Sequence, residues 1–447
     1  MNRVKVIQTA RDTNDRLTSK GEFSLAGGTQ EGVTFNLDTG KKYQKIIGFG
    51  GAFTESAAYT FSRMGPSQRD EILRKYFDPE DGIGYSIGRV HINSCDFSLE
   101  NYTYVEEGDK ELKTFDISRE DKWTVPLIKA AIETRKGDIG LLASPWSSPA
   151  WMKTNRDMNH GGQLLPEYRE AWSVYFTKYI KAMRARGLNI WAITVQNEPA
   201  AVQTWDSCIY SAEGEGSFVR DYLGPVMQRE GLSDIKIYIW DHNRDIMVER
   251  AKETLSDPEA AKYVYGIANH WYVSEEFENL SKVHELFPDK HILFSEGCQE
   301  GGVHPGSWLT GERYGRNMIG DFNNWQEGWL DWNIILDETG GPNHVGNLCD
   351  APVIADTKTQ KIHYNSSYYY IGQFSKFVKP GAARIEVTAD SGTSLQYVGF
   401  QNEDGSVVLI VMNETDKAES FNAGADGAYL SYSLPAHSIT TLLFNNK

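Results

Sequence analysis

The stretch IWAITVQNE, residues 190–198, is an apolar run that ends in the carboxylate Glu198, and Pro199 stops it immediately afterwards. Similar runs alternate with amphipathic stretches of helix length between about Lys45 and Gly372. Such alternation predicts a parallel sheet wrapped by helices. The runs number eight, the number at which such a sheet closes, so we expect an α/β fold with a (β/α)₈ TIM barrel. They occupy residues 45–51, 85–93, 139–147, 190–198, 236–243, 265–272, 291–297 and 329–336.

The stretches between these runs read as helices. Residues 66–77, 125–136 and 166–187 place apolar side chains at spacings of three and four, which is the period of an amphipathic helix. The third stretch opens with Pro166 and closes with Gly187, residues that favour the start and the end of a helix.

Both ends of the chain differ from the middle. Residues 4–39, and those from about Pro380 onward, are short apolar runs divided by turn residues, which predicts strands. A few strands at an amino terminus cannot bury a face alone, but pairing with carboxy-terminal strands would make one sandwich. We therefore expect residues 1–44 and 376–447 to form a β-sandwich side domain and residues 45–375 to form the catalytic barrel.

The charge of the chain restricts its partners. Lys and Arg number 45 against 61 Asp and Glu, a formal net charge of −16, which repels nucleic acid and anionic lipid. No stretch approaches the roughly 20 apolar residues of a membrane helix. We therefore expect no nucleic-acid partner and no membrane association; the oligomeric state is not indicated.

Compartment and thiol chemistry can also be predicted. The amino terminus lacks the apolar core of a signal peptide, which predicts a cytoplasmic protein. The four cysteines are far apart and form no Cys-x-x-Cys pair, so we expect free thiols.

Two glutamates stand where barrel chemistry is expected. Reactive groups of such barrels project from the carboxyl ends of the strands. Glu198 is the last residue of the fourth run, and Glu296 is the last but one of the seventh. Hydrolysis of a glycosidic bond with retained configuration needs two carboxyl groups about 5–5.5 Å apart, one as acid/base and one as nucleophile. We expect burial to raise the pKa of Glu198 and Glu296 to stay ionised, with Arg89 of the second run as its fixed cation.

Aromatic and polar residues gather at the same strand ends. Aromatic rings can stack on the C–H face of a sugar, and hydroxyl groups then need polar partners. Trp146, Tyr272 and Trp332 are the candidate aromatic contacts, with Trp271 and Trp329 beside them, whereas Trp151 is better explained by packing. Asp96, Asn197, His270 and Asn347 are the candidate hydroxyl partners.

Other chemistries lack their motifs. No His-x-x-x-His or His-Glu-x-x-His pair indicates zinc, so we expect no metal. The glycine-rich run at 48–51 lacks the Lys-Ser/Thr of a phosphate-binding loop and the spacing of a dinucleotide fingerprint, so we expect no cofactor. Ser147 lacks the Gly-x-Ser-x-Gly elbow of serine hydrolases.

Several motifs in order resemble glycoside hydrolase family 30, which includes glucosylceramidases. The resemblance implies a barrel fused to a β-sandwich and a retaining mechanism with Glu198 as acid/base and Glu296 as nucleophile. It implies that Asp96, Trp146, Asn197 and Trp332 contact the sugar at the cleaved end, and that Arg89, Tyr272 and Asn347 are further pocket positions. The motifs are GFGGAFTES, GRVHINSCDFS, ASPWSSPAWMKTN, TVQNEP, NHWY, FSEGC and GWLDWNIILDETGGPNHVGN.

The substrate is less tightly indicated. GRVHIN and GGPNHVGN depart from the glucosylceramidase pattern, which implies a remodelled outer pocket. We expect an exo-acting β-glucosidase or β-xylosidase that acts on small oligosaccharides. The alternatives are an endo-acting β-1,6-glucanase or xylanase, a glucosylceramidase, and, in a different class, a non-catalytic carbohydrate-binding barrel.

Overall fold

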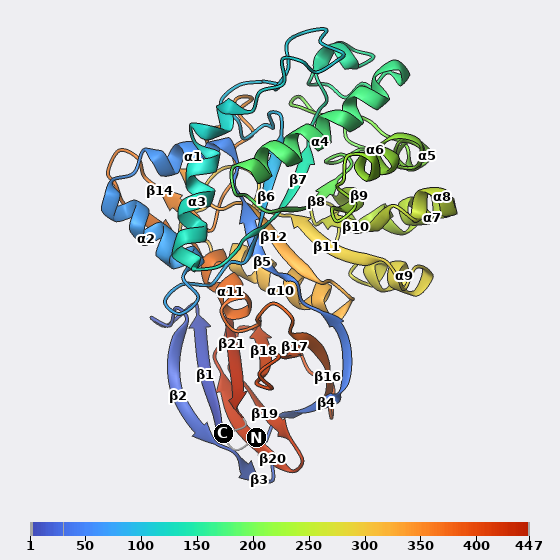
Figure 1. Cartoon of the computed structure of the whole chain (residues 1–447). Coiled ribbons are helices and arrows are strands. Elements are labelled where there is room, and N and C mark those ends of the chain that lie inside the picture. The colour runs from blue at the N-terminus through green and yellow to red at the C-terminus, as the bar shows by residue number, and fades with distance from the viewer. Residues whose placement is uncertain (1–2, 30, 446–447) are drawn as a thin grey trace.

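A computed structural model describes residues 3–29 and 31–445 of the chain. It comprises a barrel surrounded by helices and a β domain below it (Figure 1). Eight parallel strands close in the order β10-β11-β12-β5-β6-β7-β8-β9, so the predicted TIM barrel is confirmed. The strands are β5 (Gly48–Ala52), β6 (Ile87–Ile92), β7 (Gly140–Pro145), β8 (Ile190–Thr194), β9 (Lys236–Asn243), β10 (Val264–His270), β11 (His291–Glu296) and β12 (Gly328–Asn333).

The interior of the barrel is filled by alternate residues of its strands. Leu142, Ala192, Ala268, Leu293 and Leu330 belong to one buried cluster to which seven of the eight strands contribute. Side chains of a strand point alternately to its two faces, so the residues between these point outward and pack under the surrounding helices. Burial on both faces explains why the strands read as nearly continuous apolar runs.

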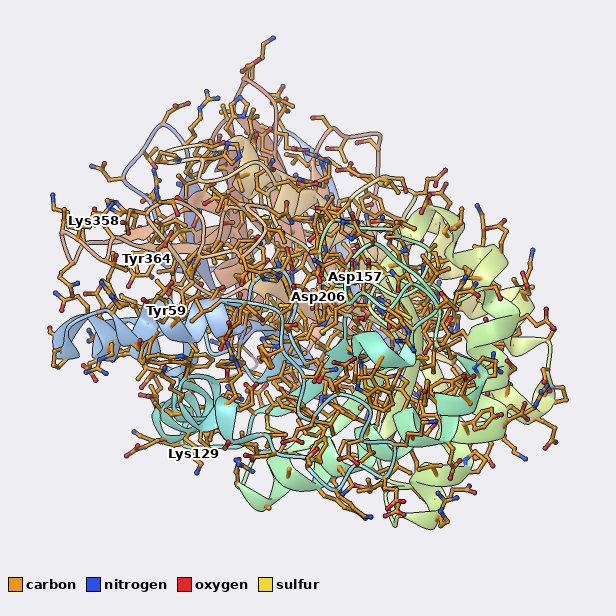
Figure 2. The ribbon with its side chains drawn as sticks, turned by 90° about the horizontal axis from the view of Figure 1, so that it is seen from above. Tyr59, Lys129, Asp157, Asp206, Lys358 and Tyr364 are labelled. Atoms are coloured by element: carbon orange, nitrogen blue, oxygen red, sulfur yellow. The ribbon has the colours of Figure 1, made fainter. Side chains whose placement is uncertain are left out.

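The helices cover the outside of the barrel (Figure 1). The three stretches predicted as helices are α2 (Pro66–Phe77), α3 (Thr124–Arg135) and α4 (Arg169–Ala185), the last preceded by a 3₁₀ turn at Pro166–Tyr168. In the view from above (Figure 2), the exposed Lys129 of α3 lies at the margin, whereas the buried Asp206 lies nearer the middle. The other helices are α1 (Glu55–Ser62), α5 (Ala212–Phe218), α6 (Gly224–Arg229), α7 (Met247–Leu255), α8 (Pro258–Ala261), α9 (Glu278–Leu286), α10 (Leu309–Asn323) and α11 (Ser366–Ser375).

Both ends of the chain build the β domain, as expected. Its ten strands pair in the order β2-β1-β21-β18-β17-β16-β4-β19-β20-β3, and Val4 of β1 lies opposite Phe444 of β21. The amino-terminal strands are β1 (Arg3–Ala10), β2 (Thr18–Ser24), β3 (Ala26–Gly27) and β4 (Val33–Lys45). The carboxy-terminal strands are β16 (Ala383–Ala389), β17 (Gln396–Gln401), β18 (Val407–Asn413), β19 (Glu419–Ala425), β20 (Ala428–Leu434) and β21 (Ser438–Asn445).

Strand β18 joins the two parts because both of its faces are buried. Leu409 and Val411 point into the core of the β domain, whereas Ile410 and Met412 belong to the core cluster of the barrel and its helices. A Cβ atom placed at Gly315 of α10 would come within 2.5 Å of the Met412 sulfur, so a larger residue there would push the helix from this strand. The β domain therefore packs directly under the barrel.

The connection after β12 carries a small sheet of its own. Strands β13 (Leu336–Asp337), β14 (Val353–Ala355) and β15 (Ile362–Tyr364) hold it together, and residues 343–347 of this connection reach the mouth of the barrel. Within the described ranges, no helix is both long and apolar enough to span a membrane.

Candidate active site

A cavity of about 300 Å³ opens at the carboxyl ends of the barrel strands. Eight of the ten predicted site residues line it: Asp96, Trp146, Asn197, Glu198, Tyr272, Glu296, Trp332 and Asn347. The other two, Arg89 and His270, are fully buried behind it. His270 was expected to bind substrate, but its ring contacts Glu198 and Asp241 and does not line the cavity.

The two glutamates converge across the mouth of the barrel. Glu296 is the last residue of β11, and Glu198 follows β8 with a left-handed backbone (φ 47°). Such a backbone is strained for a residue other than glycine, and strain of this kind clusters at functional sites. One carboxylate oxygen of each glutamate and a ring nitrogen of His270 all lie within 4.8 Å of one another. Two carboxyl groups can therefore act on the same atom of a bound molecule.

Arg89 lies beneath the cavity and holds Glu296. Its Nη1 donates to Oε2 of Glu296 at 2.7 Å, and its Nη2 donates to Oδ2 of Asp241 at 2.6 Å and to Oδ1 of Asn197 at 2.9 Å. The guanidinium also lies 4.7 Å from the centre of the Trp146 ring. A planar fork of donors suits this role because it fixes two carboxylates in defined directions. The contact between Arg89 and Glu296 is the one expected from the sequence.

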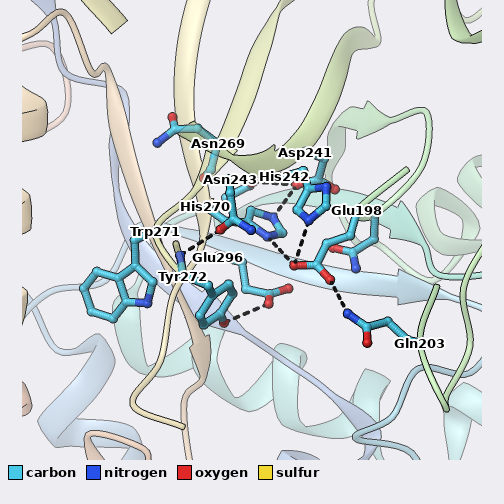
Figure 3. Close-up of polar contacts among 12 residues, drawn as sticks. Glu198, Gln203, Asp241, His242, Asn243, Asn269, His270, Trp271, Tyr272 and Glu296 are labelled. Carbon is cyan, nitrogen blue, oxygen red and sulfur yellow. Dashed lines mark hydrogen bonds and ion pairs between the residues drawn. The ribbon is translucent and has the colours of Figure 1, made fainter. Parts of the chain in front are cut away.

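Glu198 is held from the other side by histidine (Figure 3). Nδ1 of His270 lies 3.3 Å from Oε1 of Glu198, and its Nε2 lies 3.0 Å from Oδ1 of Asp241. Nε2 of His242 lies 3.8 Å from the same Glu198 oxygen, and Gln203 donates to the other oxygen at 3.4 Å. Glu296 in turn accepts a 2.9 Å hydrogen bond from Tyr272.

This network shifts the pKa values of the two glutamates in opposite directions. Burial raises the pKa of Glu198, but the hydrogen bond from His270 and the charges of His242 and His270 outweigh burial, so the pKa is lowered. Burial raises the pKa of Glu296, although His270 and Arg89 oppose it. The expectation of a raised pKa at Glu198 is therefore wrong, because a cation lies directly beside this carboxylate.

His270 carries that charge. Burial alone would lower its pKa, but Glu296, Asp241 and Glu198 raise it to about 9, so the ring is protonated at neutral pH. Asp241 stays ionised because Arg89 and His270 lower its pKa in spite of burial. Asp241 of β9 therefore contacts both cations of the site, Arg89 beneath Glu296 and His270 beside Glu198.

Asp96 forms a polar corner of the cavity. Nδ2 of Asn343 and Nδ2 of Asn347 both donate to its Oδ2, at 3.2 and 2.9 Å. Burial raises the pKa of Asp96 to about 7, although these amides oppose the shift. Near it, Trp146 and Trp332 stack with ring centres 5.1 Å apart. A carboxyl group beside aromatic faces suits a ring that carries hydroxyl groups.

The remaining predicted tryptophans belong to the core. Trp271 packs against Tyr314 and Trp329, and Trp329 stacks on Phe294 with centres 3.6 Å apart. Trp151 is buried against Tyr168, as expected. Asp241 and several residues of the cavity wall were not predicted from the sequence, although the polar residues Asp241-His242-Asn243 end the fifth run and could have indicated them. The missed wall residues include Gln203, Trp205, His242, Asn243, Cys298, Glu300 and Cys349.

Glu198, His270 and Glu296 are also the types of residue that bind metal ions. Their ligand atoms already have partners, however, since both ring nitrogens of His270 and both oxygens of Glu296 are engaged within the protein. Because the His270 ring is protonated, neither of its nitrogens has a free lone pair for a metal ion.

A closed barrel with two converging glutamates and a pocket lined by aromatic and polar side chains is typical of the class of barrel glycosidases. Residues 46–378 match the glycosyl hydrolase family 30 TIM-barrel domain, and residues 381–442 match the β-sandwich domain of that family. The chain therefore belongs to glycosyl hydrolase family 30 and is a glycoside hydrolase.

Three relatives show the range of the family around this chain. It is 36% identical over 441 residues to the mouse (Mus musculus) lysosomal acid glucosylceramidase, covering 94% of this chain and 85% of that protein. The crystal structure of SrfJ from Salmonella typhimurium superposes with a TM-score of 0.95 at 36% identity, covering all of both chains. The endo-β-1,6-glucanase BT3312 superposes with a TM-score of 0.90 at 31% identity, covering 99% of this chain and 100% of that one.

Proposed function

We propose that the protein cleaves β-glycosidic bonds by double displacement, with Glu296 as nucleophile and Glu198 as acid/base. The observation that carries the proposal is the approach of their carboxylate oxygens to within 4.8 Å. Retaining enzymes hold their carboxyl groups about 5–5.5 Å apart, whereas inverting enzymes need about 6.5–9.5 Å for an intervening water. The separation supports direct attack by Glu296 on the anomeric carbon.

In the first step, Glu296 attacks the anomeric carbon and Glu198 gives its proton to the departing oxygen. Arg89 and Tyr272 each hold one oxygen of Glu296, which orients the nucleophile. The proton must reside on Glu198, whose side chain is 12% exposed toward the cavity. A sugar that covers this face removes the remaining water and raises the pKa of Glu198, so binding moves the pair toward its working ionisation.

In the second step, Glu198 removes a proton from water, which attacks the glycosyl ester on Glu296. The sugar leaves with its original configuration, and Glu198 regains a proton. His270 stays beside Glu198 through both steps and favours its ionised form, which is the form that acts as base.

We propose a β-glucoside as the substrate, cleaved from the end of a short molecule. The names of two relatives, a glucosylceramidase and an endo-β-1,6-glucanase, both refer to glucosyl units. A cavity of about 300 Å³ is near the lower end of ordinary ligand pockets, which favours one or two sugar units. Asp96 with its two asparagines offers acceptors to the outermost hydroxyl groups.

A second candidate is endo-acting cleavage of β-1,6-glucan. It is favoured by the similarity to BT3312 over almost the whole length of both chains. A third candidate is a glucoside with an apolar aglycone, because Val273 at the rim of the cavity is 60% exposed.

Substrate length and leaving group separate these candidates. We would incubate the protein with aryl β-D-glucoside and β-D-xyloside, β-1,6-, β-1,3- and β-1,4-linked glucose dimers, β-1,6-glucan and glucosylceramide. The proposal predicts free glucose as the first product from the dimers and the aryl glucoside. Early release of longer fragments from β-1,6-glucan would show endo action, and faster release of xylose would overturn the assigned sugar. The Glu296→Ala variant is the blank for contaminating glycosidases.

A further inference from the structure

Two cysteine thiols face the active-site cavity from adjacent extended segments. Cys298 lies two residues after Glu296, and Cys349 lies two residues after Asn347. All four residues line the cavity, as expected where side chains alternate along an extended chain. The cysteines are not in a disulfide, and each is 3% exposed.

The backbone brings the two segments together in antiparallel register. Glu300 and Cys349 form a β-bridge, and the amide of Asp350 donates to the carbonyl of Gln299 at 2.8 Å. Cys298 is thus the diagonal neighbour of Cys349 on the same face. The two thiols belong to one buried cluster.

The pair also touches the residue that holds the nucleophile. The hydroxyl oxygen of Tyr272 lies 3.5 Å from Sγ of Cys298 and donates to Oε1 of Glu296 at 2.9 Å. Any ligand bound to the sulfur atoms therefore lies against Tyr272. The proposed reaction does not require either thiol.

We propose that Cys298 and Cys349 form a dithiol site for a soft, thiophilic ligand, and that occupation of this site inhibits hydrolysis by moving Tyr272 away from Glu296. Two adjacent sulfur ligands select soft metal ions and metalloids over hard cations such as Mg²⁺ or Ca²⁺. Binding requires the thiols to lose their protons, and the pKa of Cys298 is raised by Cys349 and by burial. The site therefore favours ligands that form strong bonds to sulfur.

Phenylarsine oxide is a suitable probe because it needs two neighbouring thiols. Its As=O bond and two S–H bonds break, two As–S bonds form, and one water molecule leaves, without change of oxidation state. The test treats the folded wild-type protein and the variants Cys298→Ala, Cys349→Ala and Cys208→Ala. Cys208 is a buried thiol that does not line the cavity, so its variant is the matched control.

The first measurement is the mass of the intact folded protein. The proposal predicts one arsenical per chain in the wild type and in Cys208→Ala, and none in Cys349→Ala or Cys298→Ala. Because the site needs both thiols, one cysteine variant that folds is sufficient. An unchanged adduct in a variant that lacks either cysteine would overturn the site.

The second measurement is hydrolysis, and it rests on the proposed function, whereas the mass does not. Activity should fall in proportion to the adduct and return with an excess of a 1,2-dithiol but not with a monothiol. Treated Cys349→Ala should keep the activity that it had before treatment. A wild type that carries the adduct and retains full activity would overturn the inhibitory role and leave the dithiol site standing.

Discussion

Arg89 and Glu296 form an ion pair of 2.7 Å in which the guanidinium has no exposed surface. The same guanidinium holds Asp241 at 2.6 Å, which is also fully buried. Desolvated charges of this kind are stable only as a set, since removing one leaves the others uncompensated. Glu296, the proposed nucleophile, is therefore positioned by a guanidinium that does not line the cavity.

Replacing Arg89 should damage both stability and catalysis. Because Arg89→Met leaves two buried carboxylates without their cation, we expect a loss of about 3–5 kcal/mol in the free energy of unfolding. We also expect a large loss of kcat in the protein that remains folded, because Glu296 is no longer oriented. Denaturant unfolding and kcat per folded molecule measure the two effects.

Arg244 offers a matched control, because it forms a fully buried pair with Asp321 outside the cavity. Arg244→Met should lose stability to a similar extent while the folded fraction keeps its kcat. An Arg89→Met protein with wild-type kcat would contradict the positioning role.

Replacing Glu198 and replacing Glu296 should impair hydrolysis in different ways. Glu198→Gln removes the acid, so poor leaving groups should lose about 10²–10⁴-fold in rate, whereas an activated aryl glycoside should still form the glycosyl-enzyme. Added azide should then accelerate turnover and give the β-glycosyl azide.

Glu296→Ala should lose both steps with every leaving group. Azide can enter the space left by the carboxylate and give the α-glycosyl azide. Exchange of these two product configurations between the variants would mean that the roles are exchanged, and NMR of the products decides.

The charge of His270 should set the pH range of activity. His270 lowers the pKa of both Glu198 and Glu296. In His270→Gln both pKa values rise, so both limbs of the pH profile of kcat/KM should move to higher pH. His291→Gln is the control, because His291 contacts Glu327 at the opposite end of β11. If neither limb of the pH profile moves in His270→Gln, another group governs the ionisation of Glu198 and Glu296.

Asp96 should make stability depend on pH. The pKa of Asp96 rises from 3.8 to about 7 on folding. The contribution of this carboxyl group to the free energy of unfolding is therefore fully present below pH 3.8 and is lost as the pH rises through 7. Relative to wild type, Asp96→Asn should gain stability between about pH 4 and 7, by up to about 4 kcal/mol, and then level off. Unfolding free energies across this range test the difference, with Asp70→Asn on the exposed face of α2 as a control for surface charge. A pH-independent difference would contradict the shift.

The fold could be predicted because each barrel strand is buried on both faces and therefore reads as a nearly continuous apolar run. The alternation of side chains along those strands would also have separated the tryptophans that face the cavity from those that pack in the core. Leu330 points into the barrel, so Trp332 faces the cavity and Trp329 the surrounding core. By the same alternation, Tyr272 lines the cavity whereas its neighbour Trp271 packs in the core. The strand ends at Glu198 and Glu296 were sufficient to find the pair.

The ionisation of the site could not be predicted in the same way. It depends on Asp241 and His270, which come from neighbouring strands, and on distances that only the closed barrel fixes. The proximity of Cys298 and Cys349 is likewise tertiary, because Cys349 lies in the connection after β12 and pairs with the segment that follows β11.

The most direct test of the double-displacement account is the configuration of the first sugar released, followed by NMR before mutarotation. A retaining mechanism gives the β-anomer from a β-glycoside, because Glu296 and water attack opposite faces of the sugar in turn. The α-anomer as first product would contradict it.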